Sequence, residues 1–204
     1  LFMRSGNLSI AGVSCLALRI SFTGDLGWEI YCEASKQQIV YDALVQEAFN
    51  ERGGPVGSRA LMSLRIEKGY GSWSREYSPE VWPHECGLEK LCKLDKEFLN
   101  KGELEKKLKT NPRESLMLIH LNEEDCISSN ADATGGEPVF KNGKGLGRIT
   151  SGAYGYTVGM SLALGYLKDV IPGDNVEVMV LGQSHRGKVL EAPPFDPDGI
   201  ILRN

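Results

Sequence analysis

The chain has 204 residues, of which 41% are hydrophobic, and its formal net charge is -4 at pH 7. This length can bury one sizeable core or two small ones. The negative charge argues against a general nucleic-acid binder, which would carry clustered positive charge, and no apolar run in the sequence is long enough to span a bilayer.

Cysteine and histidine spacing gives no sign of a disulfide framework or a metal site. The cysteines show neither C-x-x-C spacing nor an accompanying histidine cluster, which is typical of reduced, mostly buried thiols. They are Cys15, Cys32, Cys86, Cys92 and Cys126. The histidines, His84, His120 and His185, share no metal-ligand spacing. We therefore expect no bound metal.

The first predicted element is a hairpin. Residues 16–22 alternate in polarity with the period of a half-buried strand. Residues 23–27 (TGDLG) supply two glycines for a tight turn, and alternation resumes over residues 28–32. The period of two places Glu29 and Tyr31 on the same face of the second strand.

Two helices are predicted after the hairpin. Ser35 and Gln38 match a capping box, in which each side chain accepts a backbone N–H at the helix start. Apolar residues at helical spacing follow, and residues 53–55 (GGP) end this helix. A second helix is predicted from Ser58. Hairpin, helix, loop and helix together indicate an α+β fold.

Residues 69–95 are irregular and rich in aromatic residues and proline. Such a loop either lines a cleft or packs over a domain junction, and the sequence leaves both open. Residues 101–109 predict a connecting helix whose basic residues are interleaved with glutamates on a solvated face. Asn111 and Pro112 then break the chain.

The last part predicts a small β-barrel. Short β-like runs occur at residues 115–121, 137–140, 145–151, 161–167 and 175–180. Turn residues separate them, including Asn142-Gly143 and Pro172-Gly173-Asp174. We therefore expect three segments: an α+β part over residues 1–95, a connecting helix or linker over 96–111, and a β-barrel domain over 112–204.

Several motifs along the chain resemble one family in the same order. They are TGDLGWE, SRALMSLRIEKG, CGLEKLCKLDKEFLNK, GGEPVF, GLGRITSGAYGYTVGMSLALGYL and APPFDPDGIILR. They are similar to the aminomethyltransferase (glycine-cleavage T-protein) family, and in particular to the folate-binding C-terminal part of sarcosine and dimethylglycine dehydrogenases. The resemblance implies a ferredoxin-like, T-protein-type α+β portion that is incomplete at its N-terminus, followed by a small C-terminal β-barrel.

The resemblance also implies folate-binding residues. Glu29 matches the family glutamate that contacts the pterin, and a carboxylate can accept two parallel hydrogen bonds from it. Arg59 matches an arginine that reaches folate and could pair with a carboxylate of the substrate or of the folate tail. Phe22 stands where many members have tyrosine, so it keeps the ring without the hydroxyl. Trp73 is expected to form a cleft wall, while the role of Arg75 stays open.

Other motif residues are assigned structural roles. Arg65 and Glu67 are two residues apart in a helix and so lie on different faces, where each is expected to pair with another element. Residues 152–159 (GAYGYTVG) lack the phosphate-loop pattern and are expected to form a barrel turn.

The resemblance leaves three functions open. The first is the tetrahydrofolate-binding C-terminal module of a flavin-dependent sarcosine or dimethylglycine dehydrogenase, which captures the one-carbon unit as methylenetetrahydrofolate. The second is part of a stand-alone glycine-cleavage aminomethyltransferase. The third is a non-catalytic regulatory module, of which the regulatory subunit of pyruvate dehydrogenase phosphatase is a family example.

The same resemblance implies that the chain is a piece of a longer polypeptide. The family's acidic catalytic residue lies upstream of the stretch that begins at Leu1, so the catalytic residue is unknown here and the piece alone is expected to be inactive. FAD would bind only in an upstream domain. Expected partners are reduced folate and that upstream part, with no nucleic acid or membrane. The expected location is the bacterial cytoplasm or the mitochondrial matrix.

Overall fold

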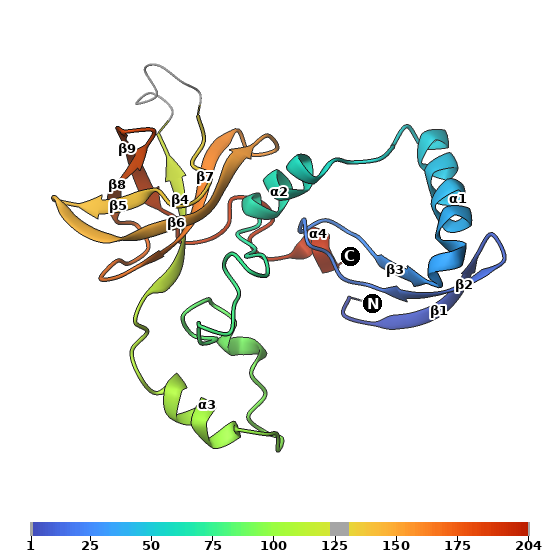
Figure 1. Cartoon of the computed structure of the whole chain (residues 1–204), viewed down its shortest axis with the longest axis horizontal. Helices are drawn as coiled ribbons and strands as arrows, with labels where there is room; N and C mark the ends of the chain where they lie inside the picture. Colours follow the sequence, from blue (N-terminus) through green and yellow to red (C-terminus); the bar gives the residue numbers. More distant parts are fainter. Residues whose placement is uncertain (1, 123–130, 204) are drawn as a thin grey trace.

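The computed structural model describes residues 2–122 and 131–203 and has two parts joined by irregular segments (Figure 1). The first part comprises β1 (Ser5–Ile10), β2 (Val13–Leu18), β3 (Glu29–Cys32), the 3-10 helix η1 (Ala34–Lys36), α1 (Gln37–Asn50) and α2 (Ser58–Glu67). The connection holds the 3-10 helix η2 (Glu89–Leu91) and α3 (Lys101–Leu108). The second part comprises β4 (Ser115–Leu121), β5 (Pro138–Lys141), β6 (Lys144–Gly155), β7 (Met160–Leu167), β8 (Asn175–Val180) and β9 (Gln183–Val189), followed by α4 (Ile200–Arg203).

The two predicted strands pair antiparallel within a three-stranded sheet of order β1-β2-β3. The predicted bounds and tight turn are wrong, because β2 ends at Leu18 and residues 19–28 form an irregular connection in which Arg19 turns aside to donate to Gly27 O and Leu202 O.

The sequence prediction missed β1, which pairs with β2 through a two-residue turn at Ala11 and Gly12. Both turn residues have positive φ, 48° and 79°, as a tight hairpin turn of the mirror-image type requires. Alanine at the first position concealed this turn in the sequence.

The two faces of β2 are buried unequally. Cys15 and Ala17 are buried, whereas Leu16 on the other face is 42% exposed. The period-two alternation was predicted correctly, but the larger apolar side chain lies on the open face. On α1, Val40 is the residue whose side chain is buried within the described chain. The first part therefore presents uncovered apolar surface on both its sheet and its helix.

The predicted capping box at Ser35 is wrong. Residues 34–36 form η1 instead, and Ser35 Oγ donates to the Glu33 carboxylate, which removes it from the helix N–H groups. The N-cap of α1 is Lys36, without a side-chain cap bond. The end of the helix is close to the prediction: Gly53 N donates to Ala48 O at 2.6 Å just beyond Asn50.

Helix α2 begins at Ser58 as predicted and packs on the second part. Figure 1 shows it beside β6 and β7, and contacts to both strands hold it there. Ser63 Oγ donates to Tyr154 O of β6 at 2.5 Å, and Ile66 is fully buried. Residues 69–95 are irregular apart from η2, and α3 confirms the predicted exposed helix, with no buried side chain.

The second part is a closed antiparallel barrel of strand order β4-β7-β6-β5-β8-β9. The five predicted strands are present, so the α+β portion followed by a β-barrel is confirmed. Its interior is filled by aliphatic side chains, namely Ile119, Leu121, Val139, Leu146, Ile149, Leu167, Val176, Val178, Val180 and Val189. The predicted turn at residues 152–159 is the β6–β7 hairpin.

The sixth strand, β9, was missed. Its buried positions hold His185, Gly187 and Val189, so only one of three inward side chains is apolar. The turn before it is Leu181-Gly182, with φ of 49° and 79°. Leucine rarely adopts a positive φ, so this turn carries no sequence pattern of the kind that Asn142-Gly143 provides.

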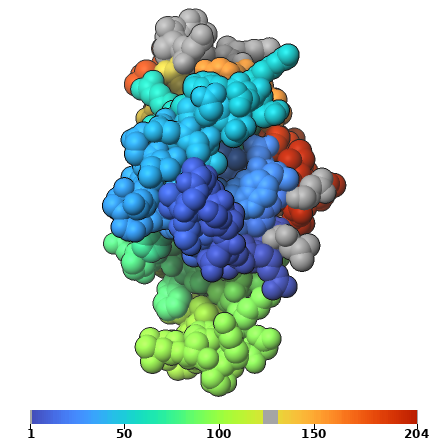
Figure 2. Space-filling view, turned by 90° about the vertical axis from the view of Figure 1, so that its right-hand side faces the viewer, coloured from blue at the N-terminus to red at the C-terminus, as the bar shows by residue number. Residues whose placement is uncertain are grey.

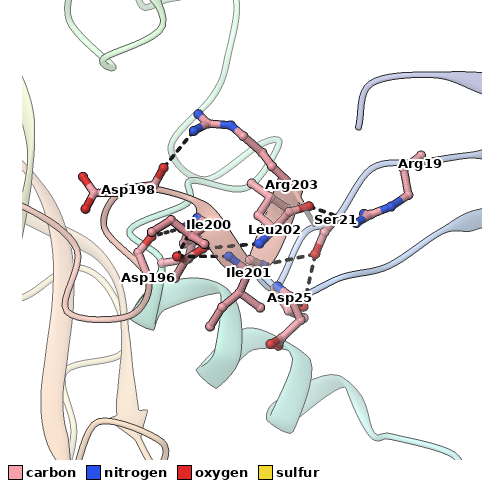
Figure 3. Close-up of polar contacts among 12 residues, drawn as sticks. Arg19, Ser21, Asp25, Asp196, Asp198, Ile200, Ile201, Leu202 and Arg203 are labelled. Atoms are coloured by element: carbon pink, nitrogen blue, oxygen red, sulfur yellow. Dashed lines mark hydrogen bonds and ion pairs between the residues drawn. The ribbon is translucent and has the colours of Figure 1, made fainter. Parts of the chain in front are cut away.

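The C-terminal tail leaves the barrel and returns to the first part of the chain (Figure 3). The Asp196 carboxylate accepts the backbone N–H groups that open α4, at 2.7 Å from Ile200 N. It also pairs with Lys68 of the first part at 3.1 Å, where both side chains are 4% exposed. Arg19 donates to Leu202 O at 3.0 Å. Figure 2 shows this red tail beside the blue strands of the sheet.

The cysteines that the structure describes, Cys15, Cys32, Cys86 and Cys92, are free thiols, as predicted. Cys15 and Cys32 lie opposite each other on β2 and β3. Cys126 lies outside the described residues. The division at residues 95 and 112 stays a prediction, because the tail contacts both parts.

Candidate functional site

Glu29 lies on β3 with its carboxylate exposed. Tyr31 Oη donates to Glu29 Oε2 at 2.6 Å, which confirms that the two side chains share one face. This hydrogen bond and the negative charge of Glu29 raise the pKa of Tyr31. Glu29 Oε1 has no hydrogen-bond partner among the described residues, so it remains available as an acceptor. Sequence reasoning had placed Tyr31 on this face without foreseeing the bond.

The other three predicted folate-binding residues lie on different elements. Phe22 is half-buried in the segment between β2 and β3. Trp73 is 73% exposed in the irregular segment after α2. Arg59 is exposed in the first turn of α2. Of these predicted residues, the cleft described next contains Arg59 but not Glu29, Phe22 or Trp73.

A cleft of about 750 Å³ lies between α2 and the barrel. The α2 side contributes Ser58, Arg59, Met62, Ser63 and Arg65, and the following segment contributes Arg75. The barrel side contributes Ala131, Asp132, Thr134, Glu137, Gly152, Ala153, Tyr154, Tyr156, Val180 and Leu181. Arg75, whose role the sequence left open, is thus brought to the same cleft as Arg59.

Beneath this cleft, a buried carboxylate joins three elements. Glu76 is 1% exposed, and its Oε1 accepts from Thr150 Oγ1 and Ser151 Oγ of β6, both at 2.6 Å. Its Oε2 accepts from Ser72 N at 2.8 Å and lies 3.3 Å from Arg65 Nη1 of α2. A buried charge is tolerated only when it is paired and hydrogen-bonded in this way.

These contacts determine the charge state of Glu76. Burial raises its pKa, but the hydrogen bonds from Ser151, Thr150 and Ser72 together with the charge of Arg65 outweigh burial, so the pKa is lowered. The carboxylate is therefore ionised at neutral pH and fixes the α2 segment to the barrel.

The structural roles predicted for Arg65 and Glu67 are confirmed. Arg65 pairs with Glu76, and Glu67 Oε1 accepts from Thr157 N at 2.8 Å in the β6–β7 hairpin. Sequence reasoning missed Glu76 as the partner of Arg65. Its partners are separated from it by up to 75 residues and carry no spacing rule that a single sequence reveals.

A second ion pair joins the irregular segment to the start of the barrel. Arg113 Nε donates to Glu85 Oε1 at 2.7 Å and its Nη2 donates to Oε2 at 2.8 Å. Two backbone groups also donate to this carboxylate, Trp82 N at 2.9 Å and Arg113 N at 3.2 Å. Mainly through the Arg113 bonds, and against the opposing effect of burial, the pKa of Glu85 falls to about 2.

We expect this pair to make stability depend on pH in the acid range. Because the folded-state pKa of about 2 lies below the ordinary 4.5, the contribution is complete above pH 4.5 and is lost as pH falls towards 2. The free energy of unfolding of Glu85→Gln should therefore change less than that of the wild type between pH 5, which lies above this window, and pH 2.5, which lies inside it. Urea unfolding at the two pH values measures this, and parallel losses in both proteins would contradict it.

Within residues 2–122 and 131–203, no cluster of three potential metal ligands occurs. None of the described helices has the length and apolar character needed to cross a membrane.

Comparisons with known proteins agree with this architecture. Residues 1–96 match the family model of the GCVT N-terminal domain, and residues 118–196 match that of the glycine cleavage T-protein C-terminal barrel domain. The chain is 32% identical over 196 residues to mitochondrial dimethylglycine dehydrogenase of Homo sapiens, covering 94% of this chain and 22% of that protein. It is 35% identical over 184 residues to an aminomethyltransferase of Thermotoga petrophila, covering 90% of this chain and 48% of that protein.

A solved structure shows the same fold. The crystal structure of glycine cleavage system aminomethyltransferase T from Bartonella henselae superposes with a TM-score of 0.82 at 21% identity, over 97% of this chain and 53% of that one. The chain thus spans about a fifth of the dehydrogenase and about half of the aminomethyltransferases. Both family models match in the family's order, and the chain folds into an α+β part followed by a closed barrel. The chain therefore belongs to the aminomethyltransferase (glycine-cleavage T-protein) family.

Proposed function

We propose that this chain is the tetrahydrofolate-binding C-terminal module of a flavin-dependent sarcosine or dimethylglycine dehydrogenase, which forms methylenetetrahydrofolate. The dehydrogenase similarity over 94% of the chain supports this proposal. The observation that carries it is Glu29, an exposed carboxylate that stands on a β-strand with one oxygen free of protein partners. Tetrahydrofolate, when bound, supplies the nitrogen atoms that capture the one-carbon unit.

The residues present fit such a ligand at both of its polar ends. Glu29 Oε1 and Oε2 can accept the two parallel N–H donors of a pterin, with Tyr31 holding the carboxylate by its hydroxyl. Arg59 has no side-chain partner among the described residues and can pair with a carboxylate. Phe22 and Trp73 offer aromatic ring surface against which a ligand can pack. We propose that these residues bind and orient tetrahydrofolate, and that the acidic residue for proton transfer lies upstream.

Uncovered apolar side chains support an upstream partner within the same polypeptide. They gather on the sheet and on α1, and the largest are Leu16, Trp28, Tyr31, Ile39, Tyr41, Leu44 and Phe49, each 42–59% exposed. Soluble proteins rarely leave contiguous apolar surface open to water. We propose that the preceding part of the polypeptide, including the FAD domain, covers these apolar side chains of the sheet and α1. A bacterial cytoplasm or a mitochondrial matrix suits such an enzyme.

A stand-alone aminomethyltransferase is the second candidate, and the similarity to the Thermotoga protein favours it. The upstream coding sequence separates the two, because a G-x-G-x-x-G motif between a strand and a helix would indicate a dinucleotide domain. A regulatory module is the third candidate, and Phe22 in place of a tyrosine is the residue that favours it.

Replacing Glu29 tests the folate assignment. In the polypeptide that contains this chain with its upstream part, Glu29→Gln should weaken tetrahydrofolate binding by about 1–3 kcal/mol, because an amide offers one acceptor to a pair of donors. Calorimetric titration measures the affinity. Glu33→Gln is the matched control, since Glu33 is an exposed glutamate just beyond β3. Equal affinity of the wild type and Glu29→Gln would remove Glu29 from the site.

A further inference from the structure

Two arginines without an ion-pair partner among the described residues line the cleft between α2 and the barrel. Arg59 and Arg75 enter it from α2 and from the segment after it, and neither guanidinium has a partner among the described residues. Each guanidinium offers a planar fork of N–H groups that matches the two oxygens of a carboxylate. Two such groups from separate elements form one cationic wall.

A third arginine, Arg65, is buried in the same wall and adds to its positive charge. Arg65 lines the cleft, is 1% exposed, and donates from Nη1 to Tyr70 O and Glu76. Its Nε has no hydrogen-bond partner in the described structure, although buried donors are nearly always satisfied. Burial lowers the pKa of Arg65, Glu76 opposes this, and the nearby charge of Arg75 lowers the pKa further. A bound anion would offset the repulsion between Arg65 and Arg75.

The acidic residues of the cleft are already engaged on the barrel side. Glu137 accepts from Thr134 N and Gly135 N, one on each oxygen and both at 2.8 Å. Asp132 Oδ1 accepts from Ser161 Oγ at 2.8 Å. Neither carboxylate forms an ion pair with Arg59 or Arg75 among the described residues, so both guanidinium groups keep their N–H donors open to a ligand.

We propose that this cleft binds a carboxylate-bearing small molecule, whose carboxylate oxygens accept from Arg59 and Arg75 beside the buried charge of Arg65. A free dicarboxylate and the glutamate tail of a folate offer this same chemistry. This carboxylate site shares Arg59 with the proposed folate site but adds Arg65 and Arg75, so a loss of carboxylate binding can be separated from the role of Glu29.

The test is titration of the 204-residue chain with glutarate and with glutaramide, its uncharged analogue, followed by nuclear magnetic resonance. We expect glutarate to bind and glutaramide not to bind. Arg75→Gln should weaken glutarate binding about tenfold, the loss expected of a charge-assisted bond. Arg148→Gln is the matched control, an exposed arginine on β6 that lies outside the cleft. Glu29→Gln should also leave glutarate binding unchanged, which separates this site from the pterin contact.

Competition in the longer polypeptide that contains this chain, which is the form expected to bind tetrahydrofolate, then distinguishes the two sources of the carboxylate. Displacement of glutarate by tetrahydrofolate but not by tetrahydropterin, which has no tail, would assign the cleft to the folate tail. Displacement by neither would assign it to a free dicarboxylate. Equal responses to glutarate and glutaramide, or equal glutarate affinity in the Arg75→Gln and Arg148→Gln variants, would overturn the proposal. Circular dichroism of each variant checks that the fold is retained.

Discussion

Glu76→Gln is expected to lower the free energy of unfolding by about 3–5 kcal/mol, which is the cost of breaking a buried ion pair by removing one partner. The variant keeps the size of the side chain but leaves Arg65 buried without its counter-charge. It also puts an N–H₂ group where the carboxylate accepts from Thr150, Ser151 and Ser72. Urea unfolding followed by circular dichroism measures the change.

Glu51→Gln is the matched control for this substitution, because Glu51 is exposed just beyond α1. Its effect should stay within about 0.5 kcal/mol. If Glu76→Gln unfolds at the same urea concentration as Glu51→Gln, then Glu76 does not join α2 to the barrel energetically.

Ile149→Ala is expected to cost about 2–5 kcal/mol of stability, because it leaves a cavity in the barrel interior. Ile149 is 1% exposed and lies in the aliphatic core formed by strands on all sides of the barrel. Ile149→Val, which removes a single methylene group, should cost about 0.5–1.5 kcal/mol. Thermal and urea unfolding of both variants check this order, and equal losses would show that the site does not form a close-packed core.

The barrel was largely predictable because most of its strands carry aliphatic residues at alternate positions between glycine-containing turns. The exception, β9, shows the limit of this pattern. His185 and Gly187 occupy inward positions, and Gly187 has its Cα against Ile119, since an added Cβ would lie 2.8 Å from that side chain. Small and polar inward residues are explained by their neighbours across the barrel, which the local pattern does not reveal.

The first part was harder to predict because its apolar residues are not all buried within the described chain. Leu16 lies on an open face although it is a large apolar residue. β1 forms a strand although it contains mainly polar and small residues, so its sequence lacks the apolar alternation that predicts a strand. The candidate site shows the same limit. Motif similarity predicted Arg59 as a site residue. That Arg75 lines the same cleft depends on the path of the segment after α2, which the sequence does not reveal.

Tetrahydrofolate titration of two proteins, the 204-residue chain and the longer polypeptide that contains it, tests most directly whether the chain is one part of a folate site. We expect the longer polypeptide to bind tetrahydrofolate and the 204-residue chain to bind it weakly or not at all. Half of a site offers fewer convergent groups, while the ligand still loses its translational and rotational freedom in full. Stoichiometric binding to the 204-residue chain tighter than about 10 μM, or no binding to the longer polypeptide, would contradict this expectation.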